Sequence, residues 1–187
     1  MKIRTINAED LDQIRQVARA ASKHPGRTAR QQALSDIKYV DYYPCHAGDT
    51  SLALELEDGT LAAYVLCAPD SQAYFRTLEQ EYRPQMETLE PGSYDPFLEA
   101  QSYIRDFAAD YPAHLHINVV PQAQNLHAGT RLMQNLLQLL EEKGIPGVCL
   151  GVDSSRAQAV HFYQKNGFQV LRDDGDTLFM GRKTARF

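Results

Sequence analysis

The chain has 187 residues, of which 43% are hydrophobic and 23% charged, so we expect one globular domain over residues 1–187 with its own core. Its 19 basic and 24 acidic side chains give a net charge of −5, which argues against a nucleic-acid partner because affinity for phosphate backbones needs clustered positive charge. The chain has three widely separated cysteines and no apolar run near the ~20 residues that cross a bilayer, so we expect a cytoplasmic protein without disulfide framework, metal site or membrane partner.

The first 37 residues predict a short strand and two helices. Residues 3–6 alternate as in a strand, and Asn7 is typical of a residue that caps a helix N-terminus. We expect the helix that follows to break at Pro25-Gly26, and a weaker helical pattern runs over residues 28–37.

A β-hairpin is the clearest feature of the middle of the chain. Residues 51–57 alternate between apolar and polar side chains, Asp58-Gly59 is typical of a turn, and residues 61–67 form a second apolar strand. After the hairpin we expect a helix from Asp70 through Tyr82 that ends before Pro84, a surface loop over residues 87–96, and a short helix over residues 97–107.

The C-terminal part predicts strands that alternate with helices. Residues 114–120 alternate as in a strand, and the apolar stripe of an amphipathic helix follows at Leu132, Leu136, Leu139 and Leu140. We then expect an interior strand over residues 148–152 that runs parallel to the previous one, a helix over residues 157–165, and a strand pair over residues 168–171 and 177–180. This order indicates an α/β fold with a mixed sheet.

The segment between residues 120 and 132 has the form of a phosphate-binding turn. The first N–H groups of a helix have no partners inside the helix, and the helix dipole adds positive charge, so a turn that enters a helix can hold a pyrophosphate. Gly129 offers backbone that a phosphate can approach closely. A plain crossover between a strand and a helix explains the same pattern equally well, so the pattern alone does not identify a ligand.

Two motifs in this region resemble those of the GNAT family of N-acetyltransferases. Residues 124–129 resemble the family's Gln/Arg-x-x-Gly-x-Gly/Ala signature, with a Val-x-Pro lead-in at residues 119–121. Residues 159–168 resemble its Ala-x-x-Phe-Tyr-x-x-x-Gly-Phe stretch. Residues 114–117 and 145–148 further resemble a bacterial branch that is related to the acetyltransferase-like domain of protein O-GlcNAc hydrolases. The resemblance implies a mixed, mostly antiparallel central sheet flanked by helices on both faces.

The same resemblance implies that the protein acetylates a primary amine with acetyl-coenzyme A (acetyl-CoA) by direct transfer in a ternary complex. The acceptor is then a small-molecule amine or a protein lysine. Strand residues would contact the pantetheine arm of the coenzyme, at Ile117, Asn118 and Val119. The turn and helix start would bind its pyrophosphate, at Gln124, Asn125, Leu126, His127, Ala128, Gly129 and Thr130.

Two positions depart from the family pattern. His127 stands in place of the first signature glycine, and Arg156 stands where an asparagine often begins the second motif. Histidine tolerates a positive φ better than most residues, so His127 either preserves the turn or, when protonated, contacts a phosphate. The alternative function is a non-catalytic acetyltransferase-like module that has lost the coenzyme and serves as an interaction domain.

The resemblance suggests Tyr163 as the acid that protonates the departing thiolate, because it matches a family tyrosine near the coenzyme sulfur. His116 is a candidate base, and Asp153, at the end of a predicted interior strand, is a candidate base or ammonium ligand. For each of these three residues the alternative to a catalytic role is a structural role in the core or in a turn. If the acceptor arrives as a neutral amine, the reaction needs no base. The sequence leaves the oligomeric state open, with edge strands that pair between chains as a route to a homodimer.

Overall fold

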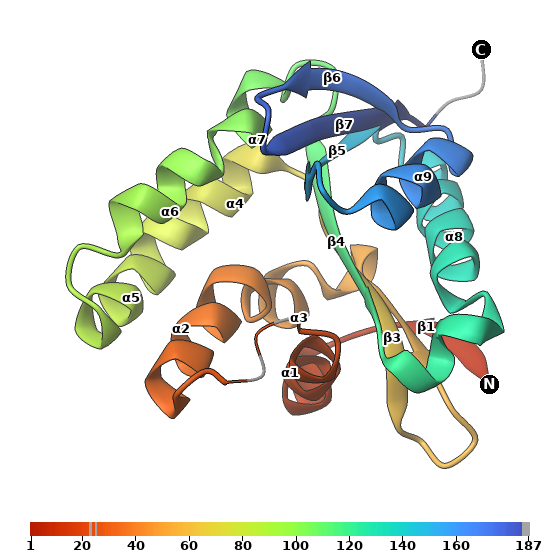
Figure 1. The fold of residues 1–187 in the computed structure, drawn as a ribbon, viewed down its shortest axis with the longest axis horizontal. Coiled ribbons are helices and arrows are strands. Elements are labelled where there is room, and N and C mark those ends of the chain that lie inside the picture. The colour runs from red at the N-terminus through yellow and green to blue at the C-terminus, as the bar shows by residue number, and fades with distance from the viewer. Residues whose placement is uncertain (23, 25, 185–187) are drawn as a thin grey trace.

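A seven-stranded sheet forms the centre of the chain (Figure 1). The computed structural model describes residues 1–22, 24 and 26–184. The strands are β1 (Lys2–Thr5), β2 (Leu52–Glu55), β3 (Leu61–Ala68), β4 (Ala113–Val119), β5 (Gly147–Asp153), β6 (Gln169–Asp173) and β7 (Thr177–Lys183). In the described chain they lie in the order β1-β2-β3-β4-β5-β7-β6, and every neighbouring pair is antiparallel except β4 and β5. The predicted mixed, mostly antiparallel sheet is confirmed.

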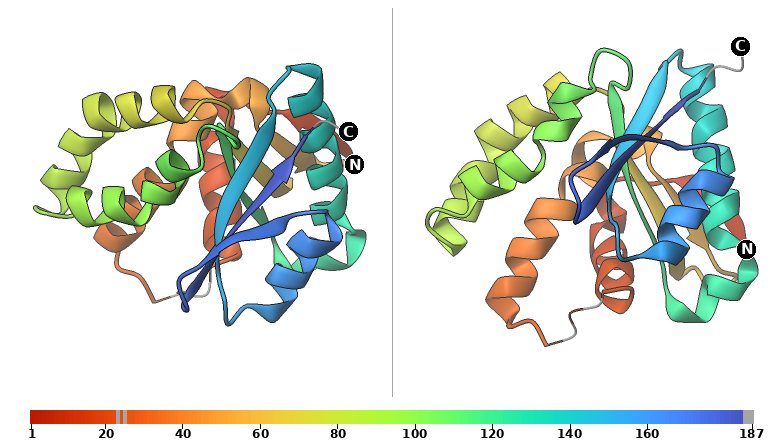
Figure 2. Two further views of the ribbon diagram at one scale, coloured as in Figure 1. Left: turned by 90° about the horizontal axis from the view of Figure 1, so that it is seen from above. Right: turned by 45° about the horizontal axis from the view of Figure 1, so that its top comes forward.

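Helices cover both faces of the sheet (Figure 2). One face carries α1 (Leu11–Ala20), α2 (Ala29–Tyr39), α3 (Tyr42–His46), α4 (Ser71–Thr77), α5 (Arg83–Leu89), α6 (Tyr94–Ala100) and α7 (Ser102–Asp106), and the other carries α8 (Ala128–Glu142) and α9 (Ala157–Lys165). Alternation along β3 divides the core accordingly, because Tyr64 and Leu66 pack with the first group while Ala63 and Val65 pack with the second. None of the helices within the described ranges is both long and apolar enough to cross a membrane.

Local sequence signals position most of these elements as predicted. The side chains of Asn7 and Thr28 each accept a backbone N–H at the start of a helical segment, and each lies in a capping box. The predicted hairpin is confirmed, since β2 and β3 pair antiparallel and Gly59 has a φ of 85° in the turn between them. The predicted helix break at Pro25 lies outside the described residues, and α1 ends at Ala20.

The predicted end of a helix before Pro84 is wrong. A π-helical segment, η3 (Leu78–Tyr82), continues α4, and the N–H of Arg83 bonds to the carbonyl of Leu78, five residues back. Pro84 therefore falls in the first turn of α5, where a backbone N–H has no partner inside the helix and its absence costs little.

The predicted surface loop over residues 87–96 is also wrong. Helix α5 continues to Leu89 and α6 begins at Tyr94, which leaves a turn of four residues. Glu87 stabilises this turn because its carboxylate accepts the N–H groups of Gly92, at 2.7 Å, and Tyr94, at 3.0 Å. The acidic and glycine-rich pattern thus belongs to a helix connection.

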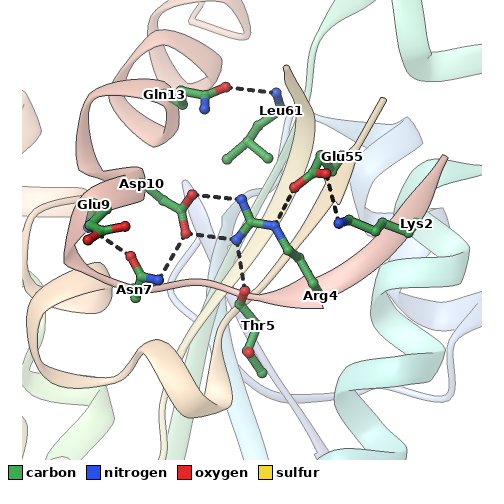
Figure 3. A network of polar contacts seen from close by, with 9 residues as sticks. All are labelled: Lys2, Arg4, Thr5, Asn7, Glu9, Asp10, Gln13, Glu55 and Leu61. Atoms are coloured by element: carbon green, nitrogen blue, oxygen red, sulfur yellow. Dashed lines mark hydrogen bonds and ion pairs between the residues drawn. The ribbon is translucent and has the colours of Figure 1, made fainter. Parts of the chain in front are cut away.

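An ionic network fixes the N-terminal strand (Figure 3). The guanidinium of Arg4 bonds to both carboxylate oxygens of buried Asp10, at 2.8 and 2.7 Å, and its Nε bonds to Glu55 at 2.5 Å. Lys2 also reaches Glu55, at 3.0 Å. Arg4 therefore joins β1, β2 and the segment that leads into α1, and it holds the pKa of Asp10 below its usual value.

Two further arginines join α1 to α2 and the residues that follow it. Arg15 forms two bonds to Asp41, at 2.9 and 2.7 Å, and Arg19 bonds to Asp36 at 2.5 Å. Asp36 and Asp41 are 2% and 6% exposed, so each arginine neutralises a carboxylate that is removed from water. The two helices are therefore held side by side.

Candidate functional site

The parallel strands β4 and β5 separate soon after they begin. They pair only at Ala113 with Val148 and at His114 with Cys149, in the part of the chain that the structure describes. Beyond these two pairs, β4 stays with β3 and β5 stays with β7. An opening therefore lies between the carboxyl-terminal halves of β4 and β5, the end of an α/β sheet where ligands commonly bind.

A cavity of about 360 Å³ begins at this opening and extends to α1 and α2. Residues of β4, β5 and α9 line one end, among them His116, Asn118, Gly151, Asp153, Arg156 and Tyr163. Residues of α1, α2 and the segment between them line the other end, among them Ser22, Arg27, Ser35, Asp36 and Tyr39. The cavity has the size of a small-molecule site.

Backbone groups of β4 point into the opening. The N–H of Val120 bonds to the carbonyl of Ala62, so the alternation of an antiparallel ladder turns the backbone of Asn118 toward β3. The same alternation turns the N–H and C=O groups of Ile117 and Val119 toward β5, from which they are separated. The structure therefore brings the backbone of Ile117 and Val119 to the opening, whereas Asn118 contributes a side chain whose Nδ2 donates to the Tyr64 hydroxyl at 2.6 Å.

The turn before α8 ends in a left-handed residue at the position of the first signature glycine. Residues 121–126 form a short 3-10 segment, and His127 follows with φ 51° and ψ 24°. His127 is the single non-glycine residue with a positive φ among those the structure describes. It therefore adopts a left-handed conformation that favours glycine, and its exposed side chain caps no N–H of α8.

The start of α8 leaves backbone donors available. The first intrahelical bond at this end runs from the N–H of Arg131 to the carbonyl of His127, so the N–H groups of residues 128–130 precede the helical ladder. Gly129 lies against α9, because a Cβ there would be 3.4 Å from the ring of Phe162 and 3.7 Å from Val119. Gln124 and Leu126 are exposed beside the turn, and the side chain of Asn125 lies outside the described residues.

Tyr163 lies on α9 with 9% of its surface exposed. It lines the cavity, and its ring packs edge-on against Phe162 and Phe168. Burial raises the pKa of its hydroxyl to about 12, and the positive charge of Arg156 acts in the opposite direction. The hydroxyl is therefore protonated at neutral pH and next to a charge that favours its ionised form.

His116 lies on β4 among aromatic rings. Its ring centroid is 5.7 Å from that of Tyr43, 6.1 Å from Tyr39 and 6.2 Å from His114. Its Nε2 is buried and has no hydrogen-bond partner among the described residues. Burial lowers the pKa of His116 to about 4, so the ring is neutral at physiological pH.

Asp153 stands at the carboxyl end of β5, where it lines the cavity. Its Oδ1 accepts the N–H of Ser155 at 2.8 Å and the hydroxyl of Ser155 at 2.6 Å, the pattern of an Asx turn. The structure thus brings Tyr163, His116 and Asp153 to one cavity. No group of three or more histidine, cysteine or acidic side chains suited to a metal ion occurs among the described residues.

The sequence did not reveal the part of the cavity that α1 and α2 provide. Arg27, Asp36 and Tyr39 belong to no motif, and Arg27 and Tyr39 lie outside the weak helical pattern of residues 28–37. Tyr39 contacts Phe97 of α6, with ring centroids 5.8 Å apart, as well as His116. Only the packing of α2 across the sheet brings these residues to β4.

Comparison with known proteins identifies both a family and a fold. The model of a family described as Acetyltransferase (GNAT) matches residues 12–168. Among solved structures, SsHAT is 22% identical, with a TM-score of 0.86 and coverage of 99% of this chain and 98% of the other. The PaiA N-acetyltransferase of Thermoplasma acidophilum, in complex with coenzyme A, is 18% identical, with a TM-score of 0.60 over 97% of this chain and 98% of the other. A Drosophila melanogaster polyamine N-acetyltransferase that forms N-acetylagmatine is 17% identical, with a TM-score of 0.59 over 97% and 99%.

Proposed function

The chain belongs to the GNAT family of acetyltransferases, and from this membership we propose that it acetylates a small primary amine by direct transfer within a ternary complex. Acetyl-CoA is the cosubstrate of the family, and a structural neighbour was crystallised with coenzyme A. Acetyl-CoA supplies an acetyl group that is activated as a thioester. The remaining chemistry falls to the residues around the cavity.

The separation of β4 from β5 is the observation that carries the proposal. It leaves the backbone of Ile117 and Val119 without a strand partner on one side, and these groups would hold the amide-containing pantetheine arm. The N–H groups of residues 128–130 and the turn at His127 would hold the pyrophosphate. These groups fit the coenzyme, and the retained left-handed turn supports binding over the non-catalytic alternative.

Three side chains would carry the proton transfers. Asp153 would attract the ammonium form of the acceptor by its charge, and the acceptor would react as the neutral amine, because an imidazole with a pKa of about 4 does not deprotonate a free ammonium. The amine nitrogen forms a bond to the acetyl carbon and loses one proton to the unpartnered Nε2 of His116, and the bond from that carbon to sulfur breaks. Tyr163 would donate its hydroxyl proton to the departing sulfur, and Arg156 would stabilise the negative charge that this leaves on the tyrosine.

The shape of the cavity supports a small acceptor over a protein lysine. Its volume of about 360 Å³ suits a single small molecule, and residues of α1 and α2 line it together with those of β4 and β5. Within the family, residues 114–117 and 145–148 support a place in the bacterial branch related to the acetyltransferase-like domain of protein O-GlcNAc hydrolases.

The proposal includes a cytoplasmic location. The three unpaired cysteines fit the reducing conditions of the cytoplasm.

The proposal is tested by two measurements on the full chain. Calorimetric titration with acetyl-CoA should show binding of one molecule per chain, and a panel of primary amines should release free thiol in the presence of acetyl-CoA. The absence of binding at millimolar acetyl-CoA would overturn the coenzyme site. Binding without thiol release from any amine would leave the coenzyme site in place and overturn the transfer to small amines.

A further inference from the structure

Resting on the proposed function, we infer that Arg27 selects acceptors that carry an anionic group, a carboxylate or a phosphate, in addition to the reactive amine. The amine end of such an acceptor would lie near His116 and Asp153, and the anionic end would lie near Arg27 at the other end of the cavity. The acceptor would then be a compact zwitterion of the amino-acid or phosphoamine type.

Arg27 is half-buried and held in place, yet its charge is not neutralised by the protein. Its Nη1 donates to the hydroxyl of Ser35 at 3.0 Å, which orients the guanidinium. Within the described residues it forms no ion pair, and the remaining guanidinium N–H groups have no acceptor. A planar group with several parallel donors is suited to bind the two oxygens of a carboxylate or phosphate.

Two other arginines of this region, the partly buried Arg15 and the exposed Arg19, behave differently. Arg15 and Arg19 each neutralise a buried carboxylate that joins α1 to the end of α2. Among the described residues, Arg27 forms no such ion pair with a buried carboxylate. It directly precedes Thr28, the N-cap of α2, where a positive charge opposes the helix dipole and lowers the stability of the helix. The stability of helix α2 therefore does not explain why an arginine precedes its N-cap.

Arg27 lines the cavity together with Tyr39 and His116, and its charge counteracts the rise that burial causes in the pKa of the Tyr39 hydroxyl. The Tyr39 ring in turn contacts that of His116, at 6.1 Å. A small acceptor bound in this cavity of about 360 Å³ would therefore have both His116 and Arg27 among the residues around it.

Two alternative roles for this charge fit the structure less well. The pyrophosphate of the coenzyme would lie at residues 127–130, and none of these residues lines the cavity that contains Arg27. Asp36 also lines the cavity, but its Oδ1 accepts from Gln32 at 2.7 Å and its Oδ2 accepts from Arg19 at 2.5 Å. Asp36 is therefore neutralised from the side of α1 and leaves Arg27 available for a ligand.

The experiment compares amines that differ only in the anionic group. Arginine and agmatine, histidine and histamine, and phosphoethanolamine and ethanolamine each pair a primary amine with and without a carboxylate or phosphate. For the native protein we expect kcat/KM to favour the anionic member of at least one pair by about 10- to 100-fold, the effect of a charge-assisted hydrogen bond. The carboxylate and phosphate pairs distinguish which oxyanion is preferred.

Substitution assigns this preference to one side chain. Arg27→Gln should bring the ratio within each pair close to one, mainly through a higher KM for the anionic member, and Arg27→Lys should retain part of the preference. Arg30→Gln is the matched control, since Arg30 is exposed on α2 and does not line the cavity. The same ranking should appear in calorimetric binding of the amines to the protein loaded with coenzyme A, which requires no turnover.

The outcomes separate this inference from the transferase activity. Thiol release with equal rates for both members of every pair would leave the transferase in place and overturn the role of Arg27, as would a preference that survives in Arg27→Gln. Absence of thiol release together with preferential, Arg27-dependent binding of the anionic amines would overturn the transfer and support the anion site.

Discussion

Tyr163 has the two properties that a proton donor in this reaction needs. It lines the cavity, and burial keeps its hydroxyl protonated, with a pKa of about 12. We therefore expect Tyr163→Phe to lower kcat by about 100-fold, in line with the loss of a general acid, while the Kd for acetyl-CoA changes by less than about twofold. Single-turnover kinetics and calorimetry would measure these two values. An unchanged rate in single turnover would remove Tyr163 from the proton transfer.

His127 keeps a backbone conformation that costs a non-glycine residue about 1 kcal/mol. If the side chain only replaces the signature glycine, His127→Gly should preserve or tighten acetyl-CoA binding, by up to about fivefold. His127→Ala serves as the control, because it removes the imidazole and retains the strain. Calorimetry distinguishes the two roles: weaker binding in both variants would show that the imidazole itself contacts a phosphate.

At the scale of elements, Arg4 shows how one side chain joins three segments. Removal of Arg4 leaves the carboxylate of Asp10, in a residue only 6% exposed, without its main partner. We expect Arg4→Met to lower the free energy of unfolding by about 3 kcal/mol, the cost of an unpaired buried charge. Lys2→Met, which breaks only the exposed contact to Glu55, should cost less than about 1 kcal/mol. Urea denaturation of both variants measures the difference, and equal losses would contradict the role given to Asp10.

Local signals in the sequence were sufficient to predict those helices and turns whose ends are determined by residues at or next to the ends. The N-cap positions of Asn7 and Thr28 and the turn glycine Gly59 act within a few residues of themselves, so their effects can be read from the chain. The error at Pro84 has a different origin. The π-helical segment before it supplies an i to i−5 bond that no propensity predicts, and this allows helix to continue beyond the proline.

The candidate site likewise has one part that lies in continuous sequence motifs and another part that depends on tertiary packing. The turn at His127 and the position of Tyr163 follow from motifs that are continuous in sequence. The cavity wall formed by Arg27 and Tyr39 does not, because it depends on how α2 packs against β4. The separation of β4 and β5 likewise depends on the twist and pairing of the whole sheet, which a strand pattern does not contain.

For the molecule as a whole, the buried His114 and the half-buried His116 should make stability depend on pH. Burial lowers the pKa of His116 to about 4 and that of His114 well below its usual value, whereas both titrate near ~6.5 in the unfolded chain. Between these values the unfolded chain binds more protons, so the free energy of unfolding falls as pH falls from about 6.5 toward 4. We expect His116 to account for roughly 2–3 kcal/mol of this loss, an upper estimate because the residue is only half-buried.

Urea titrations at pH 7.5 and pH 4.5 measure this loss directly. His116→Asn, which cannot titrate, should show a smaller difference between the two pH values than the native protein. His161→Asn is the control, since His161 is exposed on α9, and it should leave the difference unchanged. A native protein that is equally stable at both pH values would contradict the buried, neutral state of these two histidines.

The short pairing of β4 with β5 also has a consequence for thermal behaviour. In the described part of the chain, strands β1 to β4 and strands β5 to β7 share only two residue pairs across the middle of the sheet, so backbone hydrogen bonds contribute little to holding the two parts together. A ligand that bonds to β4 inside the opening and to the start of α8 would bind the folded protein and not the unfolded chain. Its binding free energy would then add to the stability of the fold, and the melting temperature would rise with coenzyme concentration.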